Sequence, residues 1–260
     1  MARVFITGSS AGLGLMAARL LIEQGHQVVV HGRDRARTES ALADAAGTEA
    51  GVTGDLSRLS DMRSVAEQAN RLGRFDAVIH NAGIGYREPR RIETPDGLPH
   101  VLAVNVVAPY VLTALMERPQ RLVYLSSGMH QHAGANLDDL LWTKRAWQGA
   151  EAYAESKFYD AILAFAVARL WPEVRSNALE PGWVPTRMGG PGAPGDLSKA
   201  HLTQAWLAVS RDPDALTSGG YFYHQRLRAA NPAAQDETVQ TRLLAACARL
   251  SGVKLPGGPA

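Results

Sequence analysis

Tyr153 and Lys157 are the side chains in this sequence whose types and spacing most directly suggest chemistry. They are four residues apart, so on a helix both lie on one face. A phenol with a pKa of about 10 exchanges protons poorly at neutral pH unless nearby positive charge favours its anion. Lys157 would supply that charge. The pair therefore indicates acid–base catalysis, although this spacing also arises by chance.

A glycine-rich segment near the N-terminus indicates a phosphate site. It reads Thr7-Gly8-Ser9-Ser10-Ala11-Gly12-Leu13-Gly14 and opens directly into a helical pattern. Its glycines let the backbone turn tightly and approach a pyrophosphate, whose charge is favoured by the amides and dipole at a helix start. We therefore expect a dinucleotide here; the alternative is a plain strand-to-helix turn.

The end of the next strand bears on which dinucleotide is bound. An acid at Gly32 would hold a ribose diol and repel a 2′-phosphate, but none is there, and Arg33 follows. The donor fork of Arg33 suits a phosphate, so NADP(H) is preferred and NAD(H) remains the alternative. Arg33 could also be a solvated loop residue. Asp34 lies two residues beyond the position of an NAD-type acid, and we expect it to cap the next helix.

Short apolar runs alternate with helical patterns, as in repeated βαβ units. This predicts an α/β fold with a doubly wound parallel sheet, that is a Rossmann fold, in a single domain over residues 1–260. The expected strands are 3–7, 27–31, 50–53, 76–80, 121–126 and 174–180; the expected helices are 12–24, 35–46, 59–72, 97–116 and 151–170. Four glycines and two prolines crowd into 188–196, and a mobile substrate-binding lid is expected around 187–202.

Composition argues against several other classes of protein. The net charge is +2, from 27 basic and 25 acidic residues, which predicts no nucleic-acid partner. Cys247 is the single cysteine and no Cys/His pairs have zinc spacing, so neither a disulfide nor a metal site is expected. The N-terminus runs straight into the first expected strand, and no apolar stretch is long enough to span a bilayer. A cytoplasmic protein without a membrane span is expected.

Five motifs in order resemble the short-chain dehydrogenase/reductase family, over nearly the whole chain. They are Thr-Gly-x-x-x-Gly-x-Gly at 7–14, Asp55-Leu56-Ser57, Asn81-Ala82-Gly83, Tyr153 with Lys157 after a Ser126-Ser127 pair, and Pro181-Gly182-Trp183-Val184-Pro185-Thr186. The resemblance implies a cofactor site built from Gly8, Ser10, Gly12, Leu13, Gly14, Arg33, Asp55, Leu56, Asn81, Ala82, Gly83, Tyr153, Lys157, Pro181, Gly182, Val184 and Thr186.

The same resemblance implies a catalytic set of Asn105, Ser127, Tyr153 and Lys157. Tyr153 would give a proton to a carbonyl oxygen during reduction and take it back during oxidation, while Ser127 hydrogen-bonds that oxygen. Lys157 would also hold the nicotinamide ribose. Asn105 would fix a helix distortion and a water that relays protons through the lysine; otherwise it is an asparagine tolerated in a semi-exposed helix.

Further matches are similar to the retinol-dehydrogenase-like branch. Ser127 and Tyr153 are 26 residues apart, and this long interval carries Leu137-Asp138-Asp139-Leu140. Three further segments resemble this branch: Thr94-Pro95-Asp96-Gly97-Leu98, Val104-Asn105-Val106 and Ser218-Gly219-Gly220-Tyr221-Phe222. The interval from Asn105 to Ser127 is short for the family, so we expect a truncated helix there and altered pairing in any homo-oligomer. The helix at 151–170 is expected to be amphipathic.

The expected function is NADPH-dependent reduction of a ketone or aldehyde, or the reverse oxidation, on a small and largely apolar substrate. The alternatives are an NAD-dependent alcohol dehydrogenase and a noncatalytic dinucleotide-sensing protein on the same fold. Other side chains have two interpretations. His130 and His132 would reach the substrate or be solvated, and Trp183 would line the substrate pocket or cover the core. Arg226 and Arg228 are expected to be solvated.

Overall fold

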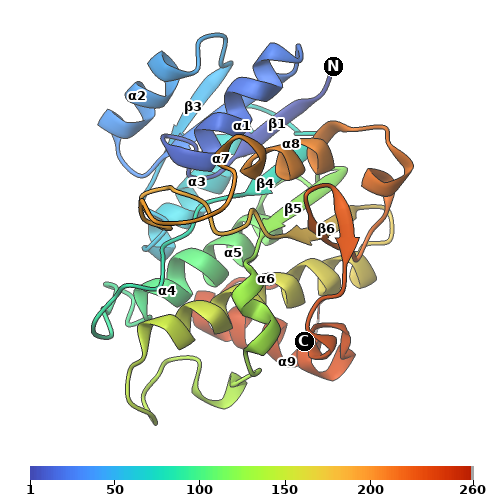
Figure 1. The fold of residues 1–260 in the computed structure, drawn as a ribbon. Coiled ribbons are helices and arrows are strands. Elements are labelled where there is room, and N and C mark those ends of the chain that lie inside the picture. Colours follow the sequence, from blue (N-terminus) through green and yellow to red (C-terminus); the bar gives the residue numbers. More distant parts are fainter. Residues whose placement is uncertain (259–260) are drawn as a thin grey trace.

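A central eight-stranded sheet organises the chain. The computed structural model describes residues 1–258, and the strand order is β3-β2-β1-β4-β5-β6-β7-β8 (Figure 1). Neighbouring strands are parallel except β7 and β8, which form an antiparallel hairpin that the sequence did not predict. The strands are β1 (Arg3–Ile6), β2 (Gln27–Gly32), β3 (Ala50–Thr53), β4 (Ala77–His80), β5 (Arg121–Leu125), β6 (Arg175–Leu179), β7 (Tyr221–Tyr223) and β8 (Arg226–Arg228). The predicted doubly wound sheet is confirmed; the expected domain's last two residues, 259 and 260, lie outside the described part.

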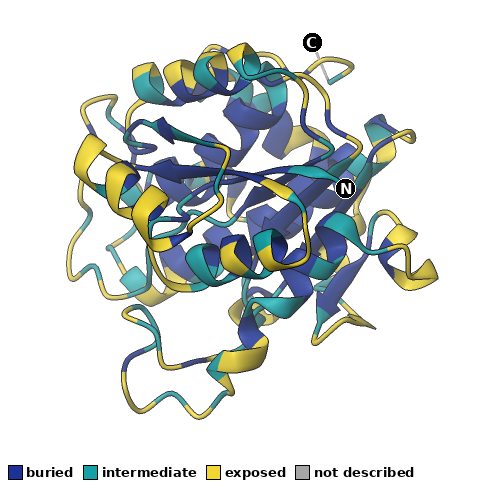
Figure 2. Ribbon diagram, turned by 90° about the horizontal axis from the view of Figure 1, so that it is seen from above, coloured by how far each residue is buried: buried dark blue, intermediate teal, exposed yellow. Residues whose placement is uncertain are grey.

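Helices cover both faces of this sheet because its central strands are apolar on both sides. Val4 and Ile6 pack on one face with α1, α2 and α8, whereas Phe5 packs on the other with α3, α5 and α6. Figure 2 shows the central strands fully buried between the two layers. The longer helices are α1 (Gly12–Glu23), α2 (Arg35–Asp44), α3 (Leu59–Arg71), α5 (Ala108–Leu115), α6 (Gly149–Leu170), α8 (Leu202–Val209) and α9 (Glu237–Ser251), with short α4 (His100–Leu102) and α7 (Leu197–Ala200).

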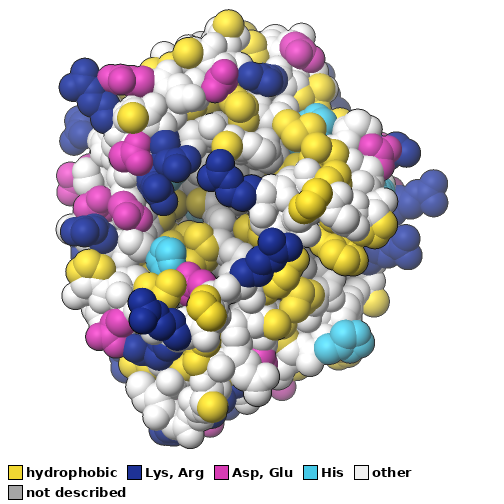
Figure 3. Space-filling view, turned by 60° about the vertical axis from the view of Figure 1, so that its left-hand side comes forward, with side chains coloured by type: hydrophobic (Ala, Val, Ile, Leu, Met, Phe, Trp, Pro, Cys, Tyr) yellow, Lys and Arg dark blue, Asp and Glu magenta, His cyan; other side chains and the backbone are white. Residues whose placement is uncertain are grey.

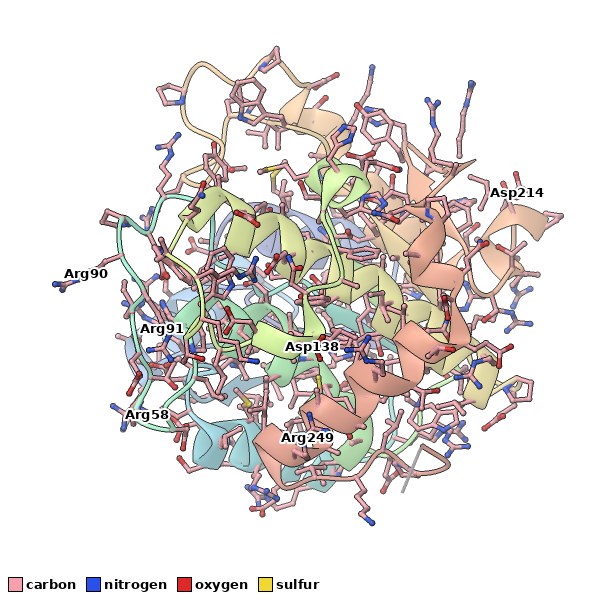
Figure 4. The ribbon with its side chains drawn as sticks, turned by 90° about the horizontal axis from the view of Figure 1, so that it is seen from below. Arg58, Arg90, Arg91, Asp138, Asp214 and Arg249 are labelled. Carbon is pink, nitrogen blue, oxygen red and sulfur yellow. The ribbon has the colours of Figure 1, made fainter. Side chains whose placement is uncertain are left out.

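The helix α6 is buried around most of its circumference, so the expectation of an amphipathic helix was wrong. The cause is α9, which packs along it and was not predicted. Arg169 of α6 donates to Gln240 of α9 at 2.9 Å. Figure 4 shows α9 from outside with Asp138 beside it, where Arg242 donates to the Asp138 carboxylate at 2.8 Å. Within residues 1–258 no helix has both the length and the apolar character to cross a membrane.

The helix expected over 97–116 is broken into three parts. Gly97 lies in a turn with a φ of +78°, so the helix begins only at His100. A π-helical turn, Ala103–Val107, then joins α4 to α5. Pro109 has no amide hydrogen to donate to the carbonyl of Asn105, four residues earlier, which favours this widening. The helix α5 ends at Leu115, one residue before the end of the expected stretch, and the truncation relative to the family stays a prediction.

The first three strands are tied together at their carboxyl ends by a buried histidine. The His31 ring accepts from the Gly8 amide at Nδ1 (3.0 Å), and its Nε2 lies 2.9 Å from the Gly54 carbonyl. The His31 amide donates to Ser9 Oγ at 2.8 Å. These contacts need a neutral ring with its proton on Nε2. Burial accordingly lowers the pKa of His31 to about 4.

This network predicts a pH-dependent stability. As pH falls from about 6.5 towards about 4, His31 becomes protonated in the unfolded chain but stays neutral in the folded protein. The free energy of unfolding therefore falls over this range. The His31→Gln variant should show a slope shallower by up to about 1.4 kcal/mol per pH unit in urea titrations over this window. The control His132→Gln alters an exposed histidine and should keep the wild-type slope. Equal slopes for His31→Gln and wild type would contradict the neutral buried ring.

Candidate active site

The glycine-rich loop packs against the Asn81-Ala82-Gly83 segment, where β1 and β4 end side by side. Asn81 Nδ2 donates to the carbonyls of Thr7 (2.9 Å) and Gly8 (3.1 Å). A Cβ atom on Gly14 would lie 2.5 Å from Asn81 Nδ2, and one on Gly8 would lie 2.8 Å from the Ala82 Cα. These two glycines are therefore required by the contact between the two segments.

Gly12 differs, because a Cβ there would meet nothing within 4 Å; its φ is +57°. It opens α1, and the preceding residue, Ala11, offers no side-chain cap to the first turn. The amides at the start of this helix thus lack a side-chain acceptor, and the helix dipole favours an anion there. Leu13 lies in the same turn, and Ser10 just before it is partly exposed. A dinucleotide pyrophosphate fits this loop.

Arg33 and Asp55 lie at the same edge of the sheet, after β2 and β3. Arg33 keeps 64% of its side chain exposed, with Nε 3.4 Å from Asp34. Asp34 accepts from the Arg37 amide at 2.8 Å, so the prediction that it caps the next helix is confirmed. Partial burial raises the pKa of Asp55, but hydrogen bonds from Ser57 and charges including Arg33 bring it below its ordinary value. The Leu56 side chain belongs to the core.

Tyr153 and Lys157, in the first turns of α6, lie close to Ser127, which follows the carboxyl end of β5. The Tyr153 hydroxyl is 3.7 Å from Met188 Sδ, and Lys157 Nζ is 5.9 Å from the centre of the Tyr153 ring. Burial raises the pKa of Tyr153, and this is opposed by the Lys157 charge and by the nearby Ser127 side chain. Ser126 instead donates to the Lys157 carbonyl at 2.6 Å and is buried. Of the two serines, Ser127 is thus the one beside the tyrosine.

Asn105 is fully buried in the π-helical turn and fixes the loop after β4. Its Oδ1 accepts from the Ile84 amide at 2.9 Å, and its Nδ2 donates to the Ile84 carbonyl (3.1 Å) and to Ser156 Oγ (2.9 Å). A Cβ atom on Gly83 would lie 3.5 Å from both Asn105 Oδ1 and Lys157 Nζ. The structure therefore brings the asparagine and the lysine to the same glycine.

The segment from Pro181 to Met188 completes the site after β6. A Cβ on Gly182, whose φ is +85°, would lie 3.3 Å from the Tyr223 ring. Thr186 Oγ1 accepts from the Gly189 amide at 3.1 Å, and the Thr186 amide donates to the Val184 carbonyl at 2.7 Å. These bonds fold the chain back, so that Met188 reaches both Tyr153 and Gly85. Figure 3 shows a hollow on this side of the molecule with Lys and Arg side chains around it.

Some candidates lie differently from the expectations. His130 is neither solvated nor free: it is buried, stacks on Tyr221 with ring centres 4.2 Å apart, and its Nδ1 lies 2.7 Å from the Ser127 carbonyl. His132 is exposed, and so are Arg226 and Arg228 as predicted. Trp183 is 60% exposed and does not cover the core. The described residues contain no group of three or more His, Cys, Asp or Glu that could hold a metal.

Two residues beside the site were missed. His31 supports the glycine-rich loop, and Asp160 contacts Lys157 at 2.8 Å. Both are buried polar residues in otherwise apolar stretches, and that contrast was the available signal.

Comparisons with known proteins agree with this arrangement. A family model described as short chain dehydrogenase matches residues 2–129. An uncharacterized oxidoreductase of Emericella nidulans, AN7799, is 42% identical over 99% of this chain and 100% of its own length. The "Putative daunorubicin C-13 ketoreductase DnrU" of Streptomyces sp. (strain C5) is 31% identical over 96% of this chain and 92% of its own length. Human retinol dehydrogenase 13 is 29% identical over 97% of this chain and 85% of its own length.

Solved structures show the same fold. A "putative uncharacterized protein" from Mycobacterium Paratuberculosis superposes with a TM-score of 0.85 at 25% identity, covering 98% of this chain and 95% of the other. A blue fluorescent protein from a metagenomic library, in complex with NADPH, gives a TM-score of 0.68 at 22% identity, covering 85% and 95%. These likenesses, the ordered motifs and their convergence at one edge of the sheet have one explanation. The chain belongs to the short-chain dehydrogenase/reductase family, in its retinol-dehydrogenase-like branch, and is an NAD(P)-dependent oxidoreductase.

Proposed function

We propose that this protein uses NADPH to reduce a ketone or aldehyde to an alcohol, or catalyses the reverse oxidation. The observation that carries the proposal is the placement of Tyr153, Lys157 and Ser127 at the sheet edge that also bears the glycine-rich loop. A relative named as a ketoreductase supports a carbonyl substrate. The tyrosine and lysine also argue against a noncatalytic dinucleotide-sensing protein.

The catalytic roles follow from proton chemistry at Tyr153. Its hydroxyl gives a proton to the carbonyl oxygen during reduction, and Ser127 donates a hydrogen bond to the same oxygen as negative charge develops there. Lys157 favours the phenolate of Tyr153 and opposes the effect of burial on its pKa, which eases donation of the proton. Asn105 fixes the loop at Gly83 and thereby the position of the backbone beside Lys157. The bound nicotinamide supplies or accepts the hydride.

The residues proposed to hold the cofactor follow its length along the strand ends. Gly8, Ser10, Gly12, Leu13 and Gly14 would surround the pyrophosphate, and Arg33 the 2′-phosphate. Asp55 and Leu56 would contact the adenine, and Asn81, Ala82 and Gly83 would lie along the ribose. Tyr153, Lys157, Pro181, Gly182, Val184 and Thr186 would surround the nicotinamide end.

Residues 187–202 are proposed as the substrate lid. Met188 lies against the Tyr153 hydroxyl, where the carbonyl oxygen must bind, so the substrate has to displace it. The Met188 thioether and the Tyr86 ring, 5.7 Å from the Tyr153 ring, would offer largely apolar surroundings. A small and mostly apolar carbonyl compound suits such a site.

Removing the Tyr153 hydroxyl tests the mechanism. The Tyr153→Phe variant should lose about 10²- to 10⁴-fold in kcat, since it lacks the general acid, when a panel of ketones and aldehydes is assayed with NADPH. The control Tyr110→Phe removes a buried hydroxyl that bonds Val253, away from the site, and should keep kcat near wild type. Undiminished turnover by Tyr153→Phe would refute the assigned role, and NADPH binding without turnover of any carbonyl or alcohol would favour a sensing protein.

Arg33→Ala tests the choice of dinucleotide. If Arg33 binds the 2′-phosphate, wild type should bind NADPH more tightly than NADH, and the variant should lose about tenfold or more in NADPH affinity alone. Nicotinamide fluorescence titrations measure both constants. Arg35→Ala, which removes a neighbouring exposed guanidinium paired with Glu39, should bind NADPH as wild type does. Equal or tighter binding of NADH by wild type would instead favour an NAD-dependent alcohol dehydrogenase.

A further inference from the structure

We propose that Asp160 is a positioning residue for Lys157: it keeps the buried ammonium charged and directs it towards Gly83, on the cofactor side. The inference rests on the proposed function, because it gives Lys157 a role in binding the cofactor. It assigns a further role to a carboxylate that the mechanism above does not use.

The contact lies one turn along α6 and is almost sealed from water. Lys157 Nζ is 2.8 Å from Asp160 Oδ2, and the two side chains are 6% and 3% exposed. Lys157 Nζ also donates to the Leu125 carbonyl at the end of β5, at 2.7 Å. These two bonds hold the ammonium between a strand end and its own helix.

An ammonium has three hydrogens, so the two bonds leave one donor. The Gly83 position is close to it, since a Cβ atom there would lie 3.5 Å from Nζ. Gly83 ends the segment that packs on the glycine-rich loop, so the ammonium lies beside the proposed ribose site. Asp160 and Leu125 thus set where the remaining donor points.

A carboxylate does more here than a neutral acceptor would. Burial disfavours the charged form of a lysine, and a buried lysine without a partner can lose its proton near neutral pH. A carboxylate in contact compensates the charge, and removing one member of a buried pair leaves the other uncompensated. Burial raises the pKa of Asp160 to about 7, and the Lys157 charge and hydrogen bond oppose this rise. Above neutral pH Asp160 is therefore a carboxylate that maintains the positive charge that Tyr153 requires.

The neighbours of Asp160 do not replace Lys157 as its partner. Burial raises the pKa of Tyr124 on β5 and of Tyr221 on β7, and the Asp160 charge raises both further. His80 lies against Tyr124 with the ring centres 4.8 Å apart and is neutral, since burial lowers its pKa to about 3. At Tyr153, Lys157 lowers the pKa and Asp160 raises it, and the effect of Lys157 is the larger. The pair as a whole thus acts on the tyrosine as a positive charge.

Asp160→Asn isolates the charge, because the amide keeps the shape and an acceptor oxygen. Lys157 should then lose its proton at a lower pH than in wild type. NADPH affinity of the variant should fall by about threefold or more between pH 7.5 and 9.5, while wild type changes little over this range. Fluorescence titration measures this without turnover, so the result does not depend on finding a substrate.

The melting temperature of the unliganded protein gives a second readout. In Asp160→Asn it should rise with pH relative to wild type, whereas the NADPH affinity should fall. In Asp160→Asn the folded lysine binds fewer protons than the unfolded one, so stability should rise with pH relative to wild type. The control Glu155→Gln alters another buried carboxylate of α6, one paired with Arg145, and should parallel wild type in both measurements. Affinity and melting temperature of Asp160→Asn that both parallel wild type would overturn the proposal.

A double variant covers the case in which Asp160→Asn does not fold. Lys157→Met combined with Asp160→Asn removes both charges, so it should be more stable than Asp160→Asn alone. A double variant no more stable than the single one would refute charge compensation. These outcomes are separate from those for Tyr153→Phe, which bear on turnover.

Discussion

The close approach of two backbone segments at the ends of β1 and β4 is the constraint on which the rest of the site depends. Gly8 and Gly14 admit Asn81 and Ala82 at distances that no side chain would allow. The chain leaves β1 and β4 in opposite directions across the sheet, so their ends form the switch point at which such sheets bind ligands. On one side of this point lies the start of α1, which favours anions, and on the other Gly83 leads to the lysine. The same contact therefore positions the proposed phosphate site and the proposed reacting groups.

The helix α6 shows how the fold supplies polar groups inside an apolar layer. Most of the helix is core, and it also carries Tyr153, Lys157 and Asp160. Such groups are tolerated in a core because each has a partner: Lys157 contacts Asp160 and the Leu125 carbonyl, and the Tyr153 hydroxyl contacts Met188. Because α9 covers the outer side of α6, the helix is held on both sides without a second chain. A rigid support of this kind suits groups that must keep their geometry during proton transfer.

The fold could be predicted from local pattern, whereas the candidate site was predicted from the resemblance of ordered motifs to a family. Apolar runs between glycine-rich turns indicated the parallel strands and their crossover helices, and the position of Asp34 before a helical pattern identified a cap. What local pattern missed depends on contacts between distant segments. The amphipathic expectation for α6 was wrong because α9, some 70 residues later, covers it. His130 is buried because Tyr221 and Asn231 enclose it. The sequence around His130 and within α6 contains no pattern that identifies these distant contacts.

The break in the helix at 103–107 combines both kinds of information. Pro109 is visible in the sequence, and its missing amide is a local reason for the chain to widen at Asn105. The role of the widened turn depends on contacts between distant segments, which the sequence does not give. The side-chain amide of Asn105 bonds the backbone of Ile84 and Ser156 Oγ. A regular helix would leave the Asn105 carbonyl in an internal bond, whereas the π-turn and the proline release it from the bond to residue 109. The distortion thus couples α6 to the loop at Gly83 through the Asn105 side chain, which bonds Ile84 of the loop and Ser156 of the helix.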